Sequence, residues 1–151
     1  MAILNIRTVG DPVLRTKAKE VQEITDKTRE LLDNMAETMY AAPGVGLAAP
    51  QVGILQRIAV IDVEDEHGLI ELINPVITEY SQEKNIVEEG CLSIPGKSAK
   101  VIRPARVTVK ALNREGKEFE LKAEGYLARA IQHELDHLDG ILFTDKALAE
   151  E

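Results

Sequence analysis

The chain has 151 residues, 44% of them hydrophobic and 29% charged, which is the size and composition of one folded domain spanning 1–151. Its formal net charge is −8 and it has no basic run, which argues against a DNA- or RNA-binding surface, because phosphate binding needs clustered Lys and Arg. No window approaches the roughly 18 apolar residues of a membrane span, and the segment Met1–Thr8 lacks a secretory signal pattern. We therefore expect a cytoplasmic protein, in which the single cysteine, Cys91, stays a free thiol.

The first predicted element is a helix over Thr25–Ala42. Apolar side chains recur there every four residues, at Leu31, Met35 and Met39, and form one stripe on a helix. Pro43-Gly44 is expected to stop it. The helix would pack this stripe against the core.

Strands are predicted in the middle of the chain. Arg57–Val63 is rich in Ile and Val, and Leu69–Ile73 follows a polar turn. Asn74-Pro75 is expected to interrupt the second of these strands, with Val76–Tyr80 continuing the sheet.

A hairpin and a second helix complete the predicted elements. Arg106–Lys110 alternates polar and apolar residues, Asn113–Gly116 has the composition of a turn, and Lys117–Leu121 is the returning strand. Helical periodicity returns over Tyr126–Leu138, and Gly140 is placed to end that helix. This order of helix, strands and helix indicates an α+β fold.

The second helix carries a pattern typical of metallohydrolases. His133 and His137 are four residues apart, so both imidazoles lie on one face of the helix, close enough to bind one metal ion. Glu134, about 100° round the helix, has the position of a general base that acts without being a ligand. The alternative is a helix whose histidines face solvent. Since His67 is the only histidine outside the motif, the distribution favours metal binding.

A catalytic metal site needs a third protein ligand beside an open position. Phe143 occupies the position of the third histidine in the metzincin pattern, and the only downstream glutamates, Glu150 and Glu151, lie at the terminus. Cys91 remains as the candidate. A lone cysteine is commonly a small buried apolar residue, but Glu-Glu-Gly before Cys91 and Ser-Ile-Pro-Gly after it indicate a loop or a strand end.

With these residues in view, the chain resembles peptide deformylase in three segments. They are Gly44-Val-Gly-Leu-Ala-Ala-Pro-Gln51, Glu89-Gly-Cys-Leu-Ser93 and Gln132-His-Glu-Leu-Asp-His-Leu-Asp-Gly140, in the order and at the spacing of that family's motifs. The resemblance runs from about Asp11 to about Asp145 and is greatest to the bacterial type 1 branch.

The resemblance implies hydrolysis of the N-terminal formyl group of N-formylmethionyl peptides, with release of formate. It implies that Cys91, His133 and His137 hold one divalent metal, Fe(II) in the first place, with zinc, nickel or cobalt as substitutes. Metal-bound hydroxide would attack the formyl carbon while Glu134 relays the proton. The implied architecture has mixed or antiparallel sheets packed around the C-terminal helix, plus an N-terminal helix.

The resemblance also implies roles for residues around the substrate. The side-chain amide of Gln51 and the backbone N–H of Leu92 would stabilise the developing oxyanion. The backbone at Val45, Gly46 and Gly90 would hydrogen-bond the peptide in the manner of a β-strand. The methionine side chain would be surrounded by Val87, Glu89, Tyr126, Arg129 and Ala130. Arg129 is expected to turn its charged head outward.

The expected partners are nascent N-formylmethionyl peptides, without DNA or membrane. Many bacterial relatives continue into a C-terminal helix, which the residues after Phe143 do not provide. A transient ribosome contact would have to do without that helix, and Glu150 and Glu151 would repel rRNA.

Two other interpretations stay open. One is a zinc peptidase, which shares the motif chemistry but would cleave ordinary unformylated peptides. The other is a binding protein with a structural metal, which is usually held by four ligands and would need His67 as the fourth.

Overall fold

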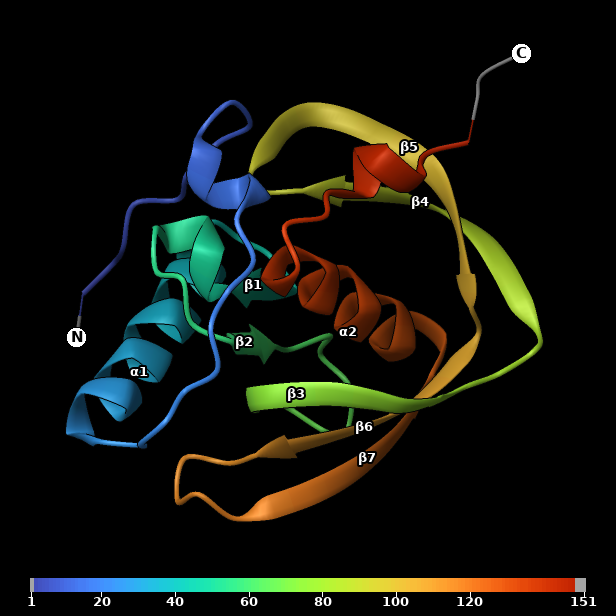
Figure 1. Ribbon diagram of the computed structural model, residues 1–151. Helices are drawn as coiled ribbons and strands as arrows, with labels where there is room; N and C mark the ends of the chain where they lie inside the picture. Colours follow the sequence, from blue (N-terminus) through green and yellow to red (C-terminus); the bar gives the residue numbers. More distant parts are fainter. Residues whose placement is uncertain (1, 149–151) are drawn as a thin grey trace.

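Two antiparallel sheets lie on opposite sides of one helix, α2 (Gly125–Leu138), as Figure 1 shows. The structure, a computed structural model, describes residues 2–148. The larger sheet has the order β1-β2-β3-β6-β7, and the smaller one pairs β4 with β5. The strands are β1 (Gly46–Ala48), β2 (Ile58–Ile61), β3 (Ile70–Tyr80), β4 (Lys84–Cys91), β5 (Ile94–Pro104), β6 (Arg106–Leu112) and β7 (Glu118–Glu124). The expected α+β fold, with antiparallel sheets around the C-terminal helix, is confirmed.

The N-terminal helix, α1, spans Asp26–Ala41, within one residue of the predicted bounds at each end. Thr25 is the N-cap residue, and its backbone N–H donates to the Thr28 hydroxyl at 3.1 Å. Met35 and Met39 are fully buried and belong to a core cluster with residues of β1 and β2. The helix ends just before the predicted Pro43-Gly44, and the Gly44 N–H donates to the Met39 carbonyl at 2.8 Å.

The strand predicted over Leu69–Ile73 does not stop at Asn74-Pro75. Instead, β3 runs through both residues, and its register with β6 shifts between Ile73 and Val76. Asn74 takes a left-handed conformation, with φ of 51°, and its side chain hydrogen-bonds both backbone groups of Val21, at 2.8 and 2.9 Å. The Asn-Pro pair is therefore a bulge that these bonds stabilise, rather than a break.

The predicted hairpin is confirmed as β6 and β7. Its turn is held by Asn113, whose side-chain oxygen accepts the backbone N–H groups of Glu115 and Lys117, both at 3.0 Å. Gly116 completes it in a left-handed conformation, with φ of 80°. The turn residues and the alternation of polar and apolar residues therefore both indicate this hairpin.

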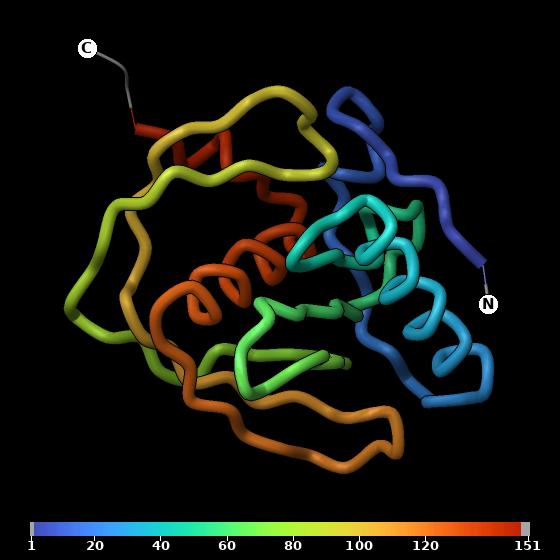
Figure 2. Tube along the Cα trace, turned by 180° about the vertical axis from the view of Figure 1, so that it is seen from behind, coloured from blue at the N-terminus to red at the C-terminus, as the bar shows by residue number. Residues whose placement is uncertain are grey.

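The β4–β5 hairpin was not predicted from the sequence. Its strands join through a tight turn at Leu92 and Ser93, so that Cys91 lies at the end of β4, in agreement with the expected strand end. Both views show the hairpin arching over α2, with the short helix η3 (Phe143–Lys146) beside β5 (Figures 1 and 2). This hairpin carries Cys91 to the central helix.

Helix α2 begins one residue before the predicted start and ends at the predicted residue. Its apolar stripe, Leu127, Ile131, Leu135 and Leu138, is buried as predicted. Gly140 follows with φ of 75°, and its N–H donates to the His137 carbonyl at 3.1 Å, which confirms the predicted stop. Within residues 2–148, no helix combines the length and the apolar composition that crossing a bilayer requires.

Candidate active site

The three predicted metal ligands meet between α2 and the end of β4. The rings of His133 and His137, one helical turn apart, have centroids 5.0 Å apart and an interplanar angle of 70°. Cys91 Sγ lies 3.3 Å from His137 Nε2. One ligand atom from each of the three residues lies within 4.8 Å of the other two, so a single ion could contact all three.

The charges at this point fit a cation. Burial, followed by the charge on His133, lowers the pKa of His137 to about 3, so this imidazole is neutral and keeps a lone pair for a metal. Burial opposes the charged form of His133 as well, but contacts with Cys91 and Glu89 and the charge of Glu134 raise its pKa to about 10. Positive charge is thus favoured where thiol and imidazoles meet. One sulfur and two nitrogen donors suit zinc or iron.

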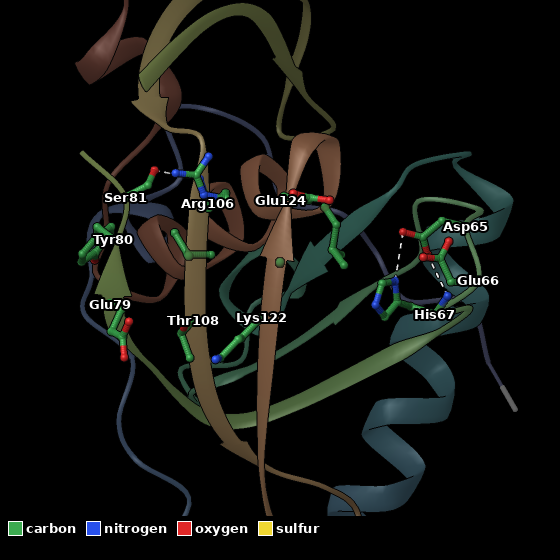
Figure 3. Close-up of a pocket in the computed structure, with 13 residues that line it drawn as sticks. Asp65, Glu66, His67, Glu79, Tyr80, Ser81, Arg106, Thr108, Lys122 and Glu124 are labelled. Atoms are coloured by element: carbon green, nitrogen blue, oxygen red, sulfur yellow. Dashed lines mark hydrogen bonds and ion pairs between the residues drawn. The ribbon is translucent and has the colours of Figure 1, made fainter. Parts of the chain in front are cut away.

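Cys91, His133 and His137 form a group of three. Within the described part of the chain, no fourth His, Cys, Asp or Glu joins the group formed by Cys91, His133 and His137. His67 lies instead in an exposed turn, with its Nδ1 3.1 Å from Asp65 Oδ2, as Figure 3 shows. The four-ligand structural site that would need His67 therefore has no support in the geometry.

Glu134 lies beside the ligands without joining them. It is only 4% exposed, and its Oε1 has no hydrogen-bond partner within residues 2–148. Burial raises its pKa to about 7, against the opposing charges of His133 and Arg103. A carboxyl group with a pKa near neutrality can both take and return a proton, as general acid–base catalysis requires.

Gln51 is oriented toward the same point. It lies in the short helix η2 (Ala49–Val52), and its Oε1 accepts the backbone N–H of Ala48 at 2.9 Å. Its Nε2 is therefore directed to Ser93 Oγ, at 3.1 Å, and to Cys91 Sγ, at 3.6 Å. Sequence reasoning missed Ser93, because its role depends on the β4–β5 turn. Leu92, in that turn, lines the cleft described next.

A cleft of about 450 Å³ opens beside Glu134 and the ligands. It is lined by seven of the predicted substrate residues, Val45, Gly46, Glu89, Gly90, Tyr126, Arg129 and Ala130, but not by Val87. Lining residues that the sequence did not indicate are Pro43, Gly44, Glu88, Ile94, Gly96 and Lys97. A larger pocket, of about 720 Å³, is lined by residues of β6 and β7 and by His67, but by none of the three ligands (Figure 3). Of these two, only the smaller cleft adjoins Cys91, His133 and Glu134.

The expected outward orientation of Arg129 is wrong. Its side chain is only 5% exposed, and its guanidinium donates to the carboxylate of Glu89. Arg103 also pairs with Glu89, at 2.6 and 3.0 Å, and Glu89 accepts from His133 Nδ1 at 3.0 Å. Burial alone would raise the pKa of Glu89, but the hydrogen bonds from His133 and Arg103 lower it to about 2. A buried anion makes a buried arginine favourable, which a sequence pattern alone does not reveal.

Comparison with known proteins agrees with this geometry. The polypeptide deformylase family matches residues 3–151. A peptide deformylase of Halothermothrix orenii is 64% identical over 98% of this chain and 96% of its own length. The crystal structure of the Thermotoga maritima peptide deformylase superposes with a TM-score of 0.94 at 46% identity, covering 97% of this chain and 99% of that one. A Synechococcus elongatus peptide deformylase, solved in complex with actinonin, gives 0.93 at 46% identity, covering 97% and 80%. The chain therefore belongs to the polypeptide deformylase family.

Proposed function

We propose that the cleft beside Glu134 is where the chain performs the reaction of its family, with Cys91, His133 and His137 holding one divalent metal ion. The chain is a hydrolase that removes the formyl group from N-formylmethionyl peptides and releases formate. The observation that carries the site assignment is the convergence of one thiol and two imidazoles next to a buried carboxyl group, one oxygen of which has no hydrogen-bond partner within residues 2–148.

The metal we propose is Fe(II), with zinc, nickel or cobalt as substitutes, since a thiolate and two imidazoles suit all four. When bound, such an ion supplies Lewis-acid chemistry, lowering the pKa of a coordinated water and polarising the formyl oxygen. Because a thiolate-ligated Fe(II) site is sensitive to oxygen, the iron-loaded protein should lose activity in air and the zinc-loaded protein should not. Iron-loaded protein that stays active after prolonged exposure to air would contradict Fe(II) as the working ion.

The proton is handled by Glu134. With its pKa raised to about 7 by burial, Glu134 takes the proton of the attacking water and returns it to the departing amine. Its Oε1, which no donor among the described residues contacts, is available for this transfer. The two-way transfer explains why a carboxyl group is needed beside the ligands rather than among them.

The developing oxyanion is stabilised by two donors. The Nε2 amide of Gln51 is one, because the bond from Ala48 to its Oε1 fixes which end of the side chain faces the site. The backbone N–H of Leu92 is the other. Preorganised donors of this kind need no reorientation as the formyl carbon becomes tetrahedral.

The peptide lies along the cleft in an extended conformation. The backbone at Val45, Gly46 and Gly90 forms its hydrogen-bonding surface, and small residues permit a close approach. The methionine side chain lies near Tyr126 and Ala130, with the Glu89–Arg129 pair behind them. Val87, which the resemblance also places around the methionine, does not line the cleft.

The biological setting we propose is the cytoplasm, where nascent N-formylmethionyl peptides are the substrates and residues 1–151 act as one catalytic domain. Any contact with the ribosome is transient. Glu150 and Glu151, expected to repel rRNA, lie outside the described residues 2–148.

The test is formate release from a formyl-Met-Ala peptide by protein loaded anaerobically with Fe(II). The control substrates are the same peptide without the formyl group and an acetylated one. We expect formate from the formyl peptide alone, loss of release after chelation, and recovery when metal is restored. Cleavage of the internal amide of the unformylated peptide would favour the zinc peptidase instead.

A further inference from the structure

The carboxylate that supports His133 is held by two buried arginines rather than one. Arg103 reaches it from β5, and Arg129 reaches it from α2. Both guanidinium groups are nearly inaccessible, with side-chain exposures of 3% and 5%. Ions buried to this extent are retained only when each is paired and hydrogen-bonded, so both contacts need an explanation.

The charges explain why one arginine is not sufficient. Arg103 is shared, since it also donates to Asp136 at 2.8 Å. Glu89 and Asp136 thus share the Arg103 guanidinium, and Arg129 gives Glu89 a second cationic partner. Lys146, which is more exposed, also contacts Asp136, at 3.1 Å.

The hydrogen bonds on Glu89 are also complete. Its Oε1 accepts from Arg103 and from His133 Nδ1, while its Oε2 accepts from Arg103 and from Arg129. Four donors fill the four lone-pair directions of a carboxylate. A donor on each side fixes the plane of the carboxylate, and this plane sets the direction of the bond to His133.

Arg129 has further contacts that connect the two parts of the metal site. Its guanidinium donates to the backbone carbonyl and the side-chain oxygen of Asn85 on β4, at 3.1 and 2.8 Å. It also donates to the Val101 carbonyl on β5, at 3.2 Å. One side chain on α2 thereby binds both strands of the hairpin that carries Cys91. His133 follows Arg129 by one helical turn on the same helix.

From these contacts we infer that Arg129 is a positioning residue for the metal site, which acts through Glu89 on His133 and through the hairpin on Cys91. It keeps Glu89 oriented to accept the His133 Nδ1–H, which leaves Nε2 as the ring nitrogen available to a metal. Partners behind a metal ligand tune affinity as well as orientation. The inference rests on the proposed metal site, and it gives a cleft-lining residue a role other than contact with methionine.

The test compares Arg129→Met, which keeps an unbranched side chain but removes the guanidinium, with Arg114→Met. Arg114 is a matched control, because it also pairs with two carboxylates, Glu71 and Asp33, and neither is a residue of the proposed site. Affinity for Co(II) is measured by competition with a chelator, together with the absorption bands of the cobalt-loaded proteins. We expect Arg129→Met to weaken Co(II) binding about 10- to 100-fold and to shift the thiolate-to-cobalt band. Arg114→Met should leave both unchanged.

A second variant covers the case in which Arg129→Met fails to fold. Arg129→Lys keeps the charge and one contact with Glu89 but cannot also reach Asn85 and Val101, so its Co(II) affinity should fall between wild type and Arg129→Met. In the zinc-loaded protein, the Nδ1–H of His133 should exchange with solvent faster in both variants, as NMR can measure. Wild-type affinity and exchange in Arg129→Lys would overturn the inference. Failure of the unaltered chain to bind Co(II) would instead overturn the proposed metal site.

Discussion

The carboxylate of Glu134 lies directly against Gly46: a Cβ built on Gly46 would be 2.5 Å from Glu134 Oε2. The same methyl would lie 2.9 Å from Cδ and 3.0 Å from Cγ of Glu134, so the whole end of the side chain would have to move. The φ angle of Gly46 is not in the left-handed region. Position 46 therefore needs a glycine because a larger residue would collide with Glu134. This gives the motif Gly44–Gln51 a role in positioning the proposed base.

Gly46→Ala should displace Glu134 while leaving Cys91, His133 and His137 in place. We expect kcat for formate release to fall about 10²- to 10⁴-fold, the range for a lost general base, with one metal still bound per chain. Gly90→Ala is the control, because a Cβ there would meet only the Lys97 carbonyl at an ordinary 3.5 Å. Equal losses of kcat in both variants would show that the effect comes from crowding of the cleft.

Gln51→Glu should remove an oxyanion donor without removing the acceptor that Ala48 uses. The carboxylate can still accept the Ala48 N–H, but no N–H remains to donate toward the site. We expect kcat to fall at least about 10²- to 10³-fold, measured with the formyl-Met-Ala peptide. Ser93→Ala, which removes only an acceptor for Gln51, should stay near wild type. A wild-type rate in Gln51→Glu would exclude the amide from catalysis.

A pH-dependent contribution to stability is expected at Tyr40. Burial, together with the hydrogen bond its hydroxyl donates to Asp62 at 2.5 Å, raises the pKa of Tyr40 to about 12. Because this value lies above the unfolded value of about 10, the contribution is complete below about pH 10 and is lost as pH rises to about 12. Tyr40 is 49% exposed, so we expect less than about 1 kcal/mol.

Denaturant unfolding of wild type and Tyr40→Phe across that pH range measures the contribution. The difference between their free energies of unfolding should shrink between about pH 10 and about pH 12, since only the wild type loses the phenolic proton. A difference that stays constant over this range would show that Tyr40 titrates normally.

Periodic segments of the sequence predicted the structure best. Leu127, Ile131 and Leu135 fix which face of α2 is buried, and the same periodicity places His133 and His137 together on another face. The β6–β7 hairpin was predictable because its turn residues and alternation agree. Helical periodicity and the turn-plus-alternation pattern are both local, so they can be recognised without knowledge of the tertiary fold.

The β4–β5 hairpin lacks such a signal. Ile86 and Val87 are consecutive and both exposed, at 55% and 39%, so apolar residues do not alternate with polar ones along β4. Arg129 was misjudged for a related reason. Its burial depends on Glu89, which is 40 positions away in the sequence and reaches it only through the hairpin. The core helix α2 could thus be predicted from the sequence. The contacts of Glu89 and Arg129 behind the proposed metal site could not, because they join segments that are distant in the sequence.

The central claim is that Cys91, His133 and His137 bind the metal while Glu134 acts only as the base. Glu134→Gln tests it most directly, with metal content and formate release measured on the same sample. Cys91→Ala is the variant for comparison. We expect Glu134→Gln to keep one metal per chain and to lose most of its turnover, because the amide cannot take a proton. Cys91→Ala should lose the metal and the activity together. Metal loss in Glu134→Gln, or turnover near the wild-type rate, would contradict the assignment of Glu134 as the base beside a Cys91, His133 and His137 site.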